Sequence, residues 1–418
     1  MKYITCYILL SLLGLMTKPS FSQDFWEIVP TPDSANPWNL TINKNGDIFS
    51  GSNGIYLSHD QGQNWEYKGL FGMLVASIAI DSSDNIFVGD GVHMYKSTNY
   101  GDNWEVVENV PGSLPLAFCS NGTMLAGGKV NAIGYLFRTK DYGISWDTVY
   151  IFQGAYEEIN DILVCPDGDY YVATVAWMGG GGGVYRSANH GATLEHIGLL
   201  DHFVFDLAIN SVGDLFAASY GQYYSGIGGC YRYNYEDSTW TDLTVNLNAD
   251  AIVINSNDDI YLGISNAVGG PGGVYRSFNG GQTWQWINSG LSGNSIERLF
   301  ISPDDYIYAL TYSSHTLNKT INSTVTSINN DIIIPEIKIF PNPFSNEFYV
   351  TVNPYSQHSK IVLTIFDMKG RIIRRIDLMA SDNLPLTVIN GRDWPRGIYC
   401  YYLILDNTCQ SGKLLKIN

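Results

Sequence analysis

Five carboxylic side chains near the middle of the chain are of the type needed for general acid–base chemistry. Two carboxyl groups about 6.5–9.5 Å apart can hydrolyse a glycosidic bond with inversion, since one protonates the leaving group while the other activates water. The sequence does not place any pair at that separation, so no catalytic residue is assigned, and solvated acidic loop residues are the favoured interpretation. The candidates are Glu157, Glu158, Asp161, Asp201 and Asp206.

Aromatic side chains accompany these carboxylates in long, Gly-rich loops, such as 175–183 and 220–229. Aromatic rings can stack on the faces of sugars while nearby carboxylates bind the hydroxyls. The same rings could instead cap the hydrophobic core. As ligand-binding candidates we take Trp177, Tyr220, Tyr223, Tyr224, Tyr156, His202 and Phe203.

Other chemistries find little support in the sequence. The run Gly179–Gly183 contains no Lys, so a phosphate-binding loop is not expected. No G-x-S-x-G or H-E-x-x-H string and no C-x-x-C pair occurs, and we predict neither a metal nor a cofactor. A net charge of −17 argues against nucleic acid, whose phosphates require a basic surface.

A repeated eight-residue motif shows which elements must position these loops. It reads S-H-D-Q-G-Q-N-W at Ser58–Trp65 and recurs at intervals of roughly 40–48 residues, starting at Ser97, Thr139, Ser187 and Ser277, with a degraded copy ending at Trp240. The Asp or Asn accepts hydrogen bonds from its own turn, the Gly takes a positive φ, and the Trp packs against the sheet. These turn-building positions are Asp60, Gly62, Trp65, Asn99, Gly101, Trp104, Asp141, Gly143, Trp146, Asn189, Gly191, Asn279, Gly281 and Trp284.

The motif resembles the Asp-box, or BNR, repeat of sialidase-like and sortilin-like propellers. Each copy follows two apolar runs separated by a polar turn, as in Trp38–Phe49 and Phe205–Phe216, which makes seven units of four short strands. We therefore predict an all-β fold with a seven-bladed β-propeller, six or eight blades being the alternatives, in residues 23–330. The segment Phe25–Val29 resembles the strand after each motif and is expected to complete the last blade.

A different pattern occupies residues 331–418, which we expect to form a small β-sandwich. The strings I-K-I-F-P-N-P-F, L-T-I-F-D-M-K-G-R, W-P-R-G-I-Y and G-K-L-L-K-I follow one another to the chain end. Together they resemble the type A sorting domain of Bacteroidota type IX secretion, which implies the secretion machinery as a partner. The motif positions are Pro341, Asn342, Pro343, Asp367, Gly370, Gly397, Tyr399 and Lys413.

The N-terminus reads as a signal peptide over residues 1–22, with Lys2, a short apolar core and small residues near Ser22. Lys18 and Pro19 interrupt the apolar run too early for a transmembrane span. Together with the sorting domain, this predicts a protein that is secreted or held on the outer cell surface.

The function classes left open are a binder, an enzyme and a structural protein. The sialidase R-I-P string is missing, and four of the propeller's arginines stand at one repeated position, as Arg186 and Arg276 do, so sialidase activity is not expected. The leading interpretation is a non-catalytic binding or scaffolding propeller that recognises a glycan or a cell-surface protein. The alternatives are an extracellular glycoside hydrolase and an adhesion protein without a small ligand.

Overall fold

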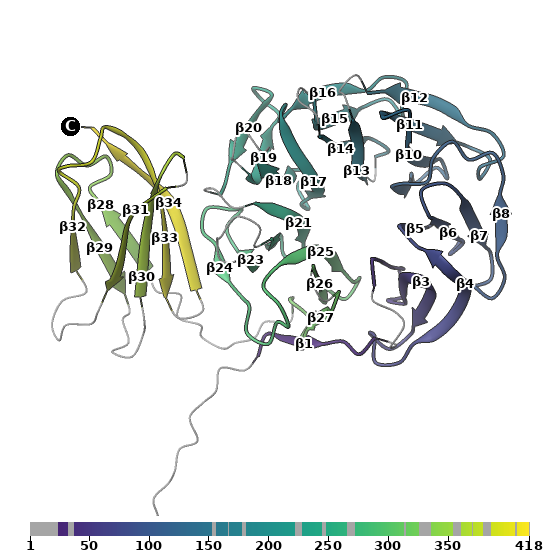
Figure 1. Cartoon of the computed structure of the whole chain (residues 1–418), viewed down its shortest axis with the longest axis horizontal. Helices are drawn as coiled ribbons and strands as arrows, with labels where there is room; N and C mark the ends of the chain where they lie inside the picture. The colour runs from purple at the N-terminus through teal and green to yellow at the C-terminus, as the bar shows by residue number, and fades with distance from the viewer. Residues whose placement is uncertain are drawn as a thin grey trace, which may run out of the picture.

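The computed structural model shows a ring of β-sheets with a smaller two-sheet domain beside it (Figure 1). The residues that it describes are 24–31, 37–152, 156–165, 167–177, 181–221, 228–244, 248–265, 272–312, 315–325, 336–353, 361–369, 371–378, 386–405 and 408–417. Every regular element among them is a strand, and no helix in this part of the chain could span a bilayer.

Seven antiparallel sheets, here called blades 1 to 7, form the ring in the described part of the chain. Blades 1 to 3 comprise β2 (Asn39–Ile42), β3 (Ile48–Ser58) and β4 (Glu66–Leu74); β5 (Ser77–Ile80), β6 (Ile86–Gly89), β7 (Met94–Ser97) and β8 (Glu105–Val107); and β9 (Leu116–Phe118), β10 (Met124–Val130), β11 (Ile133–Thr139) and β12 (Asp147–Ile151). Blades 4 and 5 comprise β13 (Glu157–Val164), β14 (Tyr170–Ala176), β15 (Gly183–Ser187) and β16 (Glu195–Gly198); and β17 (His202–Ile209), β18 (Leu215–Gly221), β19 (Gly229–Asn234) and β20 (Thr239–Asp242). Blades 6 and 7 comprise β21 (Ala249–Ile254), β22 (Ile260–Ile264), β23 (Gly273–Ser277) and β24 (Gln285–Trp286); and β25 (Ile296–Ile301), β26 (Ile307–Thr311), β27 (Leu317–Thr320) and β1 (Trp26–Ile28).

The first strand of the chain completes the last blade, as the sequence predicts. β1 pairs antiparallel with β27, with Trp26 opposite Thr320. The Trp26 side chain is 1% exposed, and its indole N–H donates to the Ile287 carbonyl at 2.5 Å. The two ends of the propeller therefore meet within one sheet, which closes the ring.

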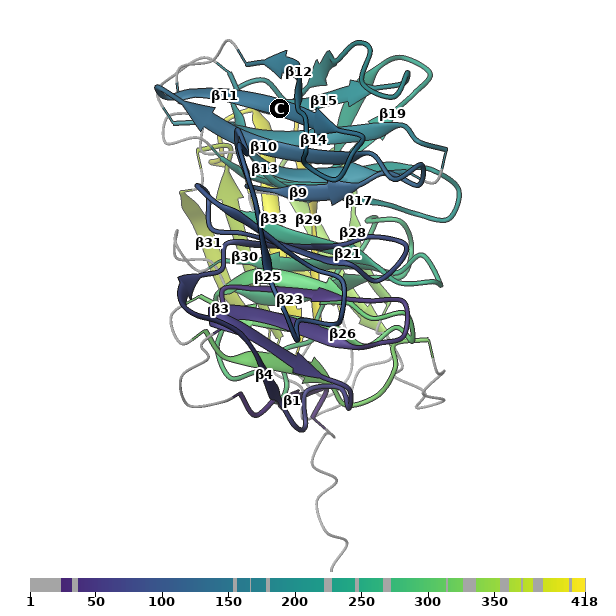
Figure 2. The same cartoon turned by 90° about the vertical axis from the view of Figure 1, so that its right-hand side faces the viewer.

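The second strand of each blade is apolar because both of its faces are covered by neighbouring blades. β14, with the sequence YYVATVA, is buried at every position, and β22 and β26 are buried throughout as well. A continuous apolar run of this length is typical of a strand covered on both faces. Figure 2 shows the ring edge-on, with the blades stacked in layers of strands.

The inner strands of blades 4 to 7 each contain a β-bulge, whereas those of blades 1 to 3 pair in regular register. The register shifts after Ile159, Val204, Ala249 and Ile296. A bulge inserts one unpaired residue and re-aims its side chain. The inserted residues stand at the same place in four successive blades: Asn160, Phe205, Asp250 and Glu297.

The repeated motif forms the hairpin between the third and fourth strands. In the first copy the Ser58 hydroxyl accepts from the Gly62 N–H at 2.8 Å and the Asp60 carboxylate accepts from the Asn64 N–H at 2.8 Å. The backbone N–H groups of Asn103, Ser145, Thr193 and Thr283 donate in the same way to Asn99, Asp141, Asn189 and Asn279. The glycines of these turns have φ between 84° and 95°: Gly62, Gly101, Gly143, Gly191 and Gly281.

The tryptophans of the motif connect neighbouring blades. The indole N–H of Trp65 donates to Pro30, that of Trp104 to Lys68 and that of Trp284 to Leu243, each a backbone carbonyl of the preceding blade or segment. Trp240 of the degraded copy donates to Ile197 in the same manner. Trp146 differs, because its indole donates to Gly143 in its own turn.

The C-terminal domain packs two sheets face to face. Their strands are β28 (Glu336–Phe340), β29 (Glu347–Asn353) and β32 (Leu386–Asn390), and β30 (Ile361–Asp367), β31 (Ile372–Leu378), β33 (Gly397–Leu405) and β34 (Thr408–Lys416). Phe344, Phe348, Leu363 and Leu414 form the centre of its buried core. This is the small β-sandwich expected from the sequence.

Most described residues of the sorting motif lie near turns or on the outer strand β34 of this sandwich, whereas Tyr399 is buried in its core on β33. The Asn342 amide donates to the Lys413 carbonyl at 2.7 Å, and the Tyr399 hydroxyl donates to the Pro395 carbonyl at 2.7 Å. The Asp367 carboxylate pairs with Arg371. Pro341 and Pro343 flank Asn342, Gly397 has a φ of 149°, and Gly370 lies outside the described residues.

The sandwich contacts the propeller at blades 5 and 6. Tyr402 is buried in the same cluster as Trp284, and the Lys413 ammonium lies 3.4 Å from the Asp242 carboxylate.

Candidate functional site

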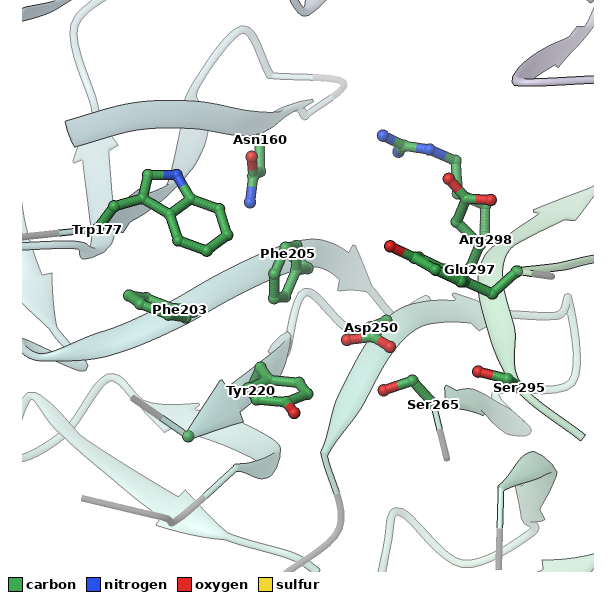
Figure 3. A pocket seen from close by; sticks show the side chains of 12 residues that line it. Asn160, Trp177, Phe203, Phe205, Tyr220, Asp250, Ser265, Ser295, Glu297 and Arg298 are labelled. Carbon is green, nitrogen blue, oxygen red and sulfur yellow. The ribbon is translucent and has the colours of Figure 1, made fainter. Parts of the chain in front are cut away.

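A pocket of about 740 Å³ opens beside the inner strands of blades 4 to 7 (Figure 3). We call it the aromatic pocket. It is lined by Asn160, Trp177, Phe203, Phe205, Tyr220, Gly221, Asp250, Ser265, Ser295, Glu297, Arg298 and Tyr312.

Aromatic rings from blades 4 and 5 make one wall of the pocket. Trp177 follows β14 and is 55% exposed, and its ring centroid lies 5.1 Å from that of Phe203 on β17. Phe205, on the same strand, meets Tyr220 of β18 edge to face at 6.3 Å. Figure 3 shows these four rings along one side of the hollow. They offer a broad apolar surface with ring faces open to a ligand.

Polar side chains from blades 6 and 7 make the opposite wall (Figure 3). Burial raises the pKa of Asp250 to about 7; the nearby Ser265 hydroxyl opposes this rise, and the charge of Glu297 adds to it. Burial also raises the pKa of Glu297, against the opposing charges of Arg298 and His315. The His315 ring nitrogen lies 3.6 Å from the Glu297 carboxylate. Two carboxyl groups with raised pKa values therefore face the aromatic rings.

The β-bulges explain why these side chains meet. All four inserted residues, from Asn160 to Glu297, line the aromatic pocket. Because the inserted residue is released from the ladder, its side chain turns from the sheet toward the open end of the ring. Among the described pairs formed by the innermost strands, a bulge occurs only in the blades that build this pocket, so this asymmetry of the ring and the place of the pocket coincide.

A second hollow of about 610 Å³ lies at the centre of the ring, and we call it the central cavity. It is bordered by residues of the inner strands β2, β5, β9, β13, β17 and β25. Asn160 and Arg298 line both this cavity and the aromatic pocket. The two hollows are therefore adjacent and share part of their walls.

Asp161 and Asp206 form a carboxyl pair in the wall of the central cavity. Asp161 accepts from the Leu207 N–H at 3.2 Å, and Asp206 accepts from the Ile252 N–H at 2.8 Å. Burial raises the pKa of both groups, and the charge of Asp161 raises that of Asp206 further. Each carboxyl group reaches the backbone of the next blade, so the pair also connects three blades.

Three of the predicted ligand-binding residues, Trp177, Tyr220 and Phe203, line the aromatic pocket. Tyr156 lies instead under the Lys129 ammonium, 5.4 Å from the ring centroid. His202 is not in the pocket lining: it contacts the Ser219 hydroxyl at 3.1 Å and packs edge to face on Tyr231. Tyr223 and Tyr224 lie outside the described residues.

The five candidate carboxylates separate into three environments. Glu158, Asp161 and Asp206 line the central cavity. Glu157 is 1% exposed and accepts hydrogen bonds from Thr174, Tyr185 and the Gly182 N–H, so it anchors the glycine loop of blade 4. Asp201 is exposed in a turn with a φ of 65°.

Phe205, Asp250, Glu297 and Arg298 belong to the pocket but not to the predicted set. A signal for them exists in the repeat, because N-D-I, F-D-L, D-A-I and E-R-L occupy the same place in four units. The inserted residue can be identified only when the inner strand is aligned with the strand that it pairs with. Without that alignment, alternation along the strand places the inserted side chain on the wrong face of the sheet.

Comparison with known proteins assigns the C-terminal part and the fold. Residues 338–417 match the family model of the secretion system C-terminal sorting domain. The chain therefore carries a sorting domain of type IX secretion and is exported to the cell surface or beyond, with the secretion machinery as a partner. No curated protein sequence matches the chain.

Solved structures with a similar fold include PorZ, a surface component of the type IX secretion system of Porphyromonas gingivalis. It has a TM-score of 0.53 and 13% identity, and the match covers 93% of this chain and 60% of PorZ. The extracellular domain of BT4673 from B. thetaiotaomicron has a TM-score of 0.55 and 15% identity, over 80% of this chain and 47% of that one. The GH74 enzyme of Niastella koreensis has a TM-score of 0.56 and 14% identity, over 94% and 75%.

The chain thus spans about 60% of PorZ and about half of BT4673. At these identities the similarity establishes a β-propeller fold and nothing about the ligand.

Proposed function

We propose that this exported propeller binds a glycan in the aromatic pocket. The observation that carries the proposal is the pairing of two unlike walls in one hollow of about 740 Å³: aromatic rings on one side, and carboxyl, hydroxyl and guanidinium groups on the other. A sugar ring has apolar C–H faces and a rim of hydroxyl groups, and such a pair of walls complements both.

The shape of the site favours a small ligand over a folded protein. Pockets for small molecules typically measure about 300–1,000 Å³, whereas a stable protein interface buries about 1,200–2,000 Å² of surface. The rings of Trp177 and Phe203 lie inside the hollow and do not form a flat patch. A glycan is therefore the better-supported of the two ligands that the sequence leaves open.

Replacing Trp177 by alanine is expected to lower the affinity for the bound glycan at least about tenfold, equivalent to about 1.4 kcal/mol. The reason is the loss of the exposed ring that stacks on the sugar. A glycan-array screen followed by titration calorimetry on the purified protein measures this. Phe278→Ala is the matched control, because Phe278 is an equally accessible ring (45% exposed) on the hairpin at the other end of a blade. Equal losses in both variants, or none in Trp177→Ala, would contradict the proposal.

A glycoside hydrolase is the second candidate function, favoured by the two carboxyl groups of the polar wall. With its pKa raised to about 7, Asp250 keeps its proton near neutral pH, as a general acid requires. Glu297, whose pKa is also raised, would be the partner that acts in its ionised form. The fold shared with a GH74 enzyme does not by itself support this activity.

If the bound glycan is cleaved, the rate is expected to follow a bell-shaped pH profile. It falls above about pH 7 as Asp250 loses its proton, and it falls in acid as Glu297 gains one. Asp250→Asn should lower kcat by at least about 100-fold, while Asp201→Asn, on an exposed turn outside the pocket, should leave it unchanged. Mass spectrometry of the products decides between the two functions, because an intact glycan after prolonged incubation leaves binding alone.

A further inference from the structure

The aromatic pocket and the central cavity are neighbouring hollows that share part of their walls. Asn160 and Arg298 stand at the boundary and line both hollows. Arg298 is exposed and makes no ion pair with any described residue. The two residues shared by both hollows therefore both have polar side chains.

The lining of the two hollows selects against an acidic ligand. The pocket contributes Asp250 and Glu297, and the cavity contributes Glu158, Asp161 and Asp206, against the two cations Arg298 and Lys129. Lys129 already pairs with Glu158. Residues 23–330 as a whole carry 11 basic and 32 acidic side chains. A uronate or sulfate group would find few cations among these carboxyl groups, whereas the hydroxyls of an uncharged sugar can donate to a carboxylate and accept from a protonated carboxyl group.

We propose that the ligand is an uncharged oligosaccharide whose chain continues from the aromatic pocket, past Asn160 and Arg298, into the central cavity. This inference rests on the proposed function and extends it. One sugar ring packs on Trp177 and Phe203, and the following units place their hydroxyls against the carboxyl groups at the centre of the ring. The two hollows, of about 740 and 610 Å³, together exceed what a single sugar needs.

The test is a size series of ligands bound to the full mature chain. Cello-, xylo-, manno- and malto-oligosaccharides of one to six units are titrated by calorimetry, with oligogalacturonides as the acidic series. Within the neutral series that binds, affinity is expected to rise at least tenfold between two and five units. The acidic series is expected to bind at least tenfold more weakly than that neutral series.

Glu158→Trp separates the two hollows in this experiment. Glu158 lines the central cavity but not the aromatic pocket, and its ion pair with Lys129 is partly exposed, so its replacement costs little stability. The bulky ring should remove the gain from the longer oligosaccharides and leave the disaccharide affinity within twofold. Glu158→Gln, which keeps the size of the side chain, should retain most of the gain.

Each outcome bears on one of the two proposals. An affinity that stops rising at two units, an effect of Glu158→Trp on all lengths alike, or none on the longer ones overturns the path through the cavity and leaves the pocket standing. Stronger binding of the acidic series overturns the uncharged ligand. The absence of binding to any saccharide rejects the proposed function itself, and this inference with it.

Discussion

Trp26→Ala is expected to lower the free energy of unfolding of the propeller by about 3–5 kcal/mol. The side chain is 1% exposed in a cluster with Tyr261, Ile287 and Ile296, and its indole N–H donates to the Ile287 carbonyl. Truncation leaves a cavity between blades 6 and 7 and an unpaired buried carbonyl. The same strand closes the ring, so the loss acts at the one place where the two ends of the propeller meet.

Ile28→Ala is the matched control, because Ile28 lies two residues along the same strand and is 58% exposed. Its effect should stay within about 0.5 kcal/mol. Urea denaturation followed by tryptophan fluorescence, with calorimetry as a second probe, measures both variants. A small effect of Trp26→Ala, or the same loss in both variants, would mean that the N-terminal strand adds little to the closed ring.

Removal of residues 336–418 is expected to abolish delivery of the protein to the cell surface. These residues form the sandwich that matches the sorting domain. Of the propeller's buried clusters, the one around Trp284 also takes in Tyr402 of the sandwich, whereas the others, such as the cluster of Trp26, are built from propeller residues alone. The truncated chain should therefore fold but accumulate in the periplasm, on the inner side of the outer membrane. Cell fractionation with surface protease digestion measures the change, which should approach complete loss from the surface.

Two controls bracket this second experiment. Trp177→Ala in the full chain should reach the surface at the normal level, since Trp177 lies in the pocket and not in the sandwich. Residues 336–418 fused to an unrelated periplasmic reporter should carry that reporter outward. Surface delivery of the truncated chain would show that the propeller holds an export signal of its own.

The propeller architecture was predictable because the residues of each repeat determine the local structure of that repeat. The turn residues of the eight-residue motif are chosen for hydrogen bonds within the turn, and these depend on neighbours only four positions away, as in Ser58 and Gly62. The closing strand was predictable as well, since Phe25–Val29 reads like the strand that follows each motif. Local signals of this kind do not depend on the rest of the fold.

The aromatic wall of the pocket was predictable from the sequence, whereas the polar wall was not. Trp177, Phe203 and Tyr220 lie in or beside long loops, and aromatic residues in such loops are typical of ligand-binding sites. Asp250 and Glu297 stand within strands, and a single inserted residue decides which face they occupy. That choice depends on the pairing with the next strand, and the sequence of one strand does not contain it. His202 was predicted to bind a ligand because it precedes Phe203 in the sequence. Its ring packs on Tyr231 instead, and it is not in the lining of the aromatic pocket.

Because β1 pairs with β27, the ring can close only in a chain that has been synthesised as far as β27. Trp26 finds its partner at Ile287, 261 residues later, so the last blade can form only after nearly the whole propeller has been made. Any product that stops before β27 leaves strand edges open, where proteases and other chains can attach. β27, the strand with which β1 pairs, is also the last propeller strand before the sorting domain in the sequence. A chain that carries the sorting domain therefore also contains β27 and can close its ring. A chain that ends before β27 has neither the closed ring nor the sorting domain.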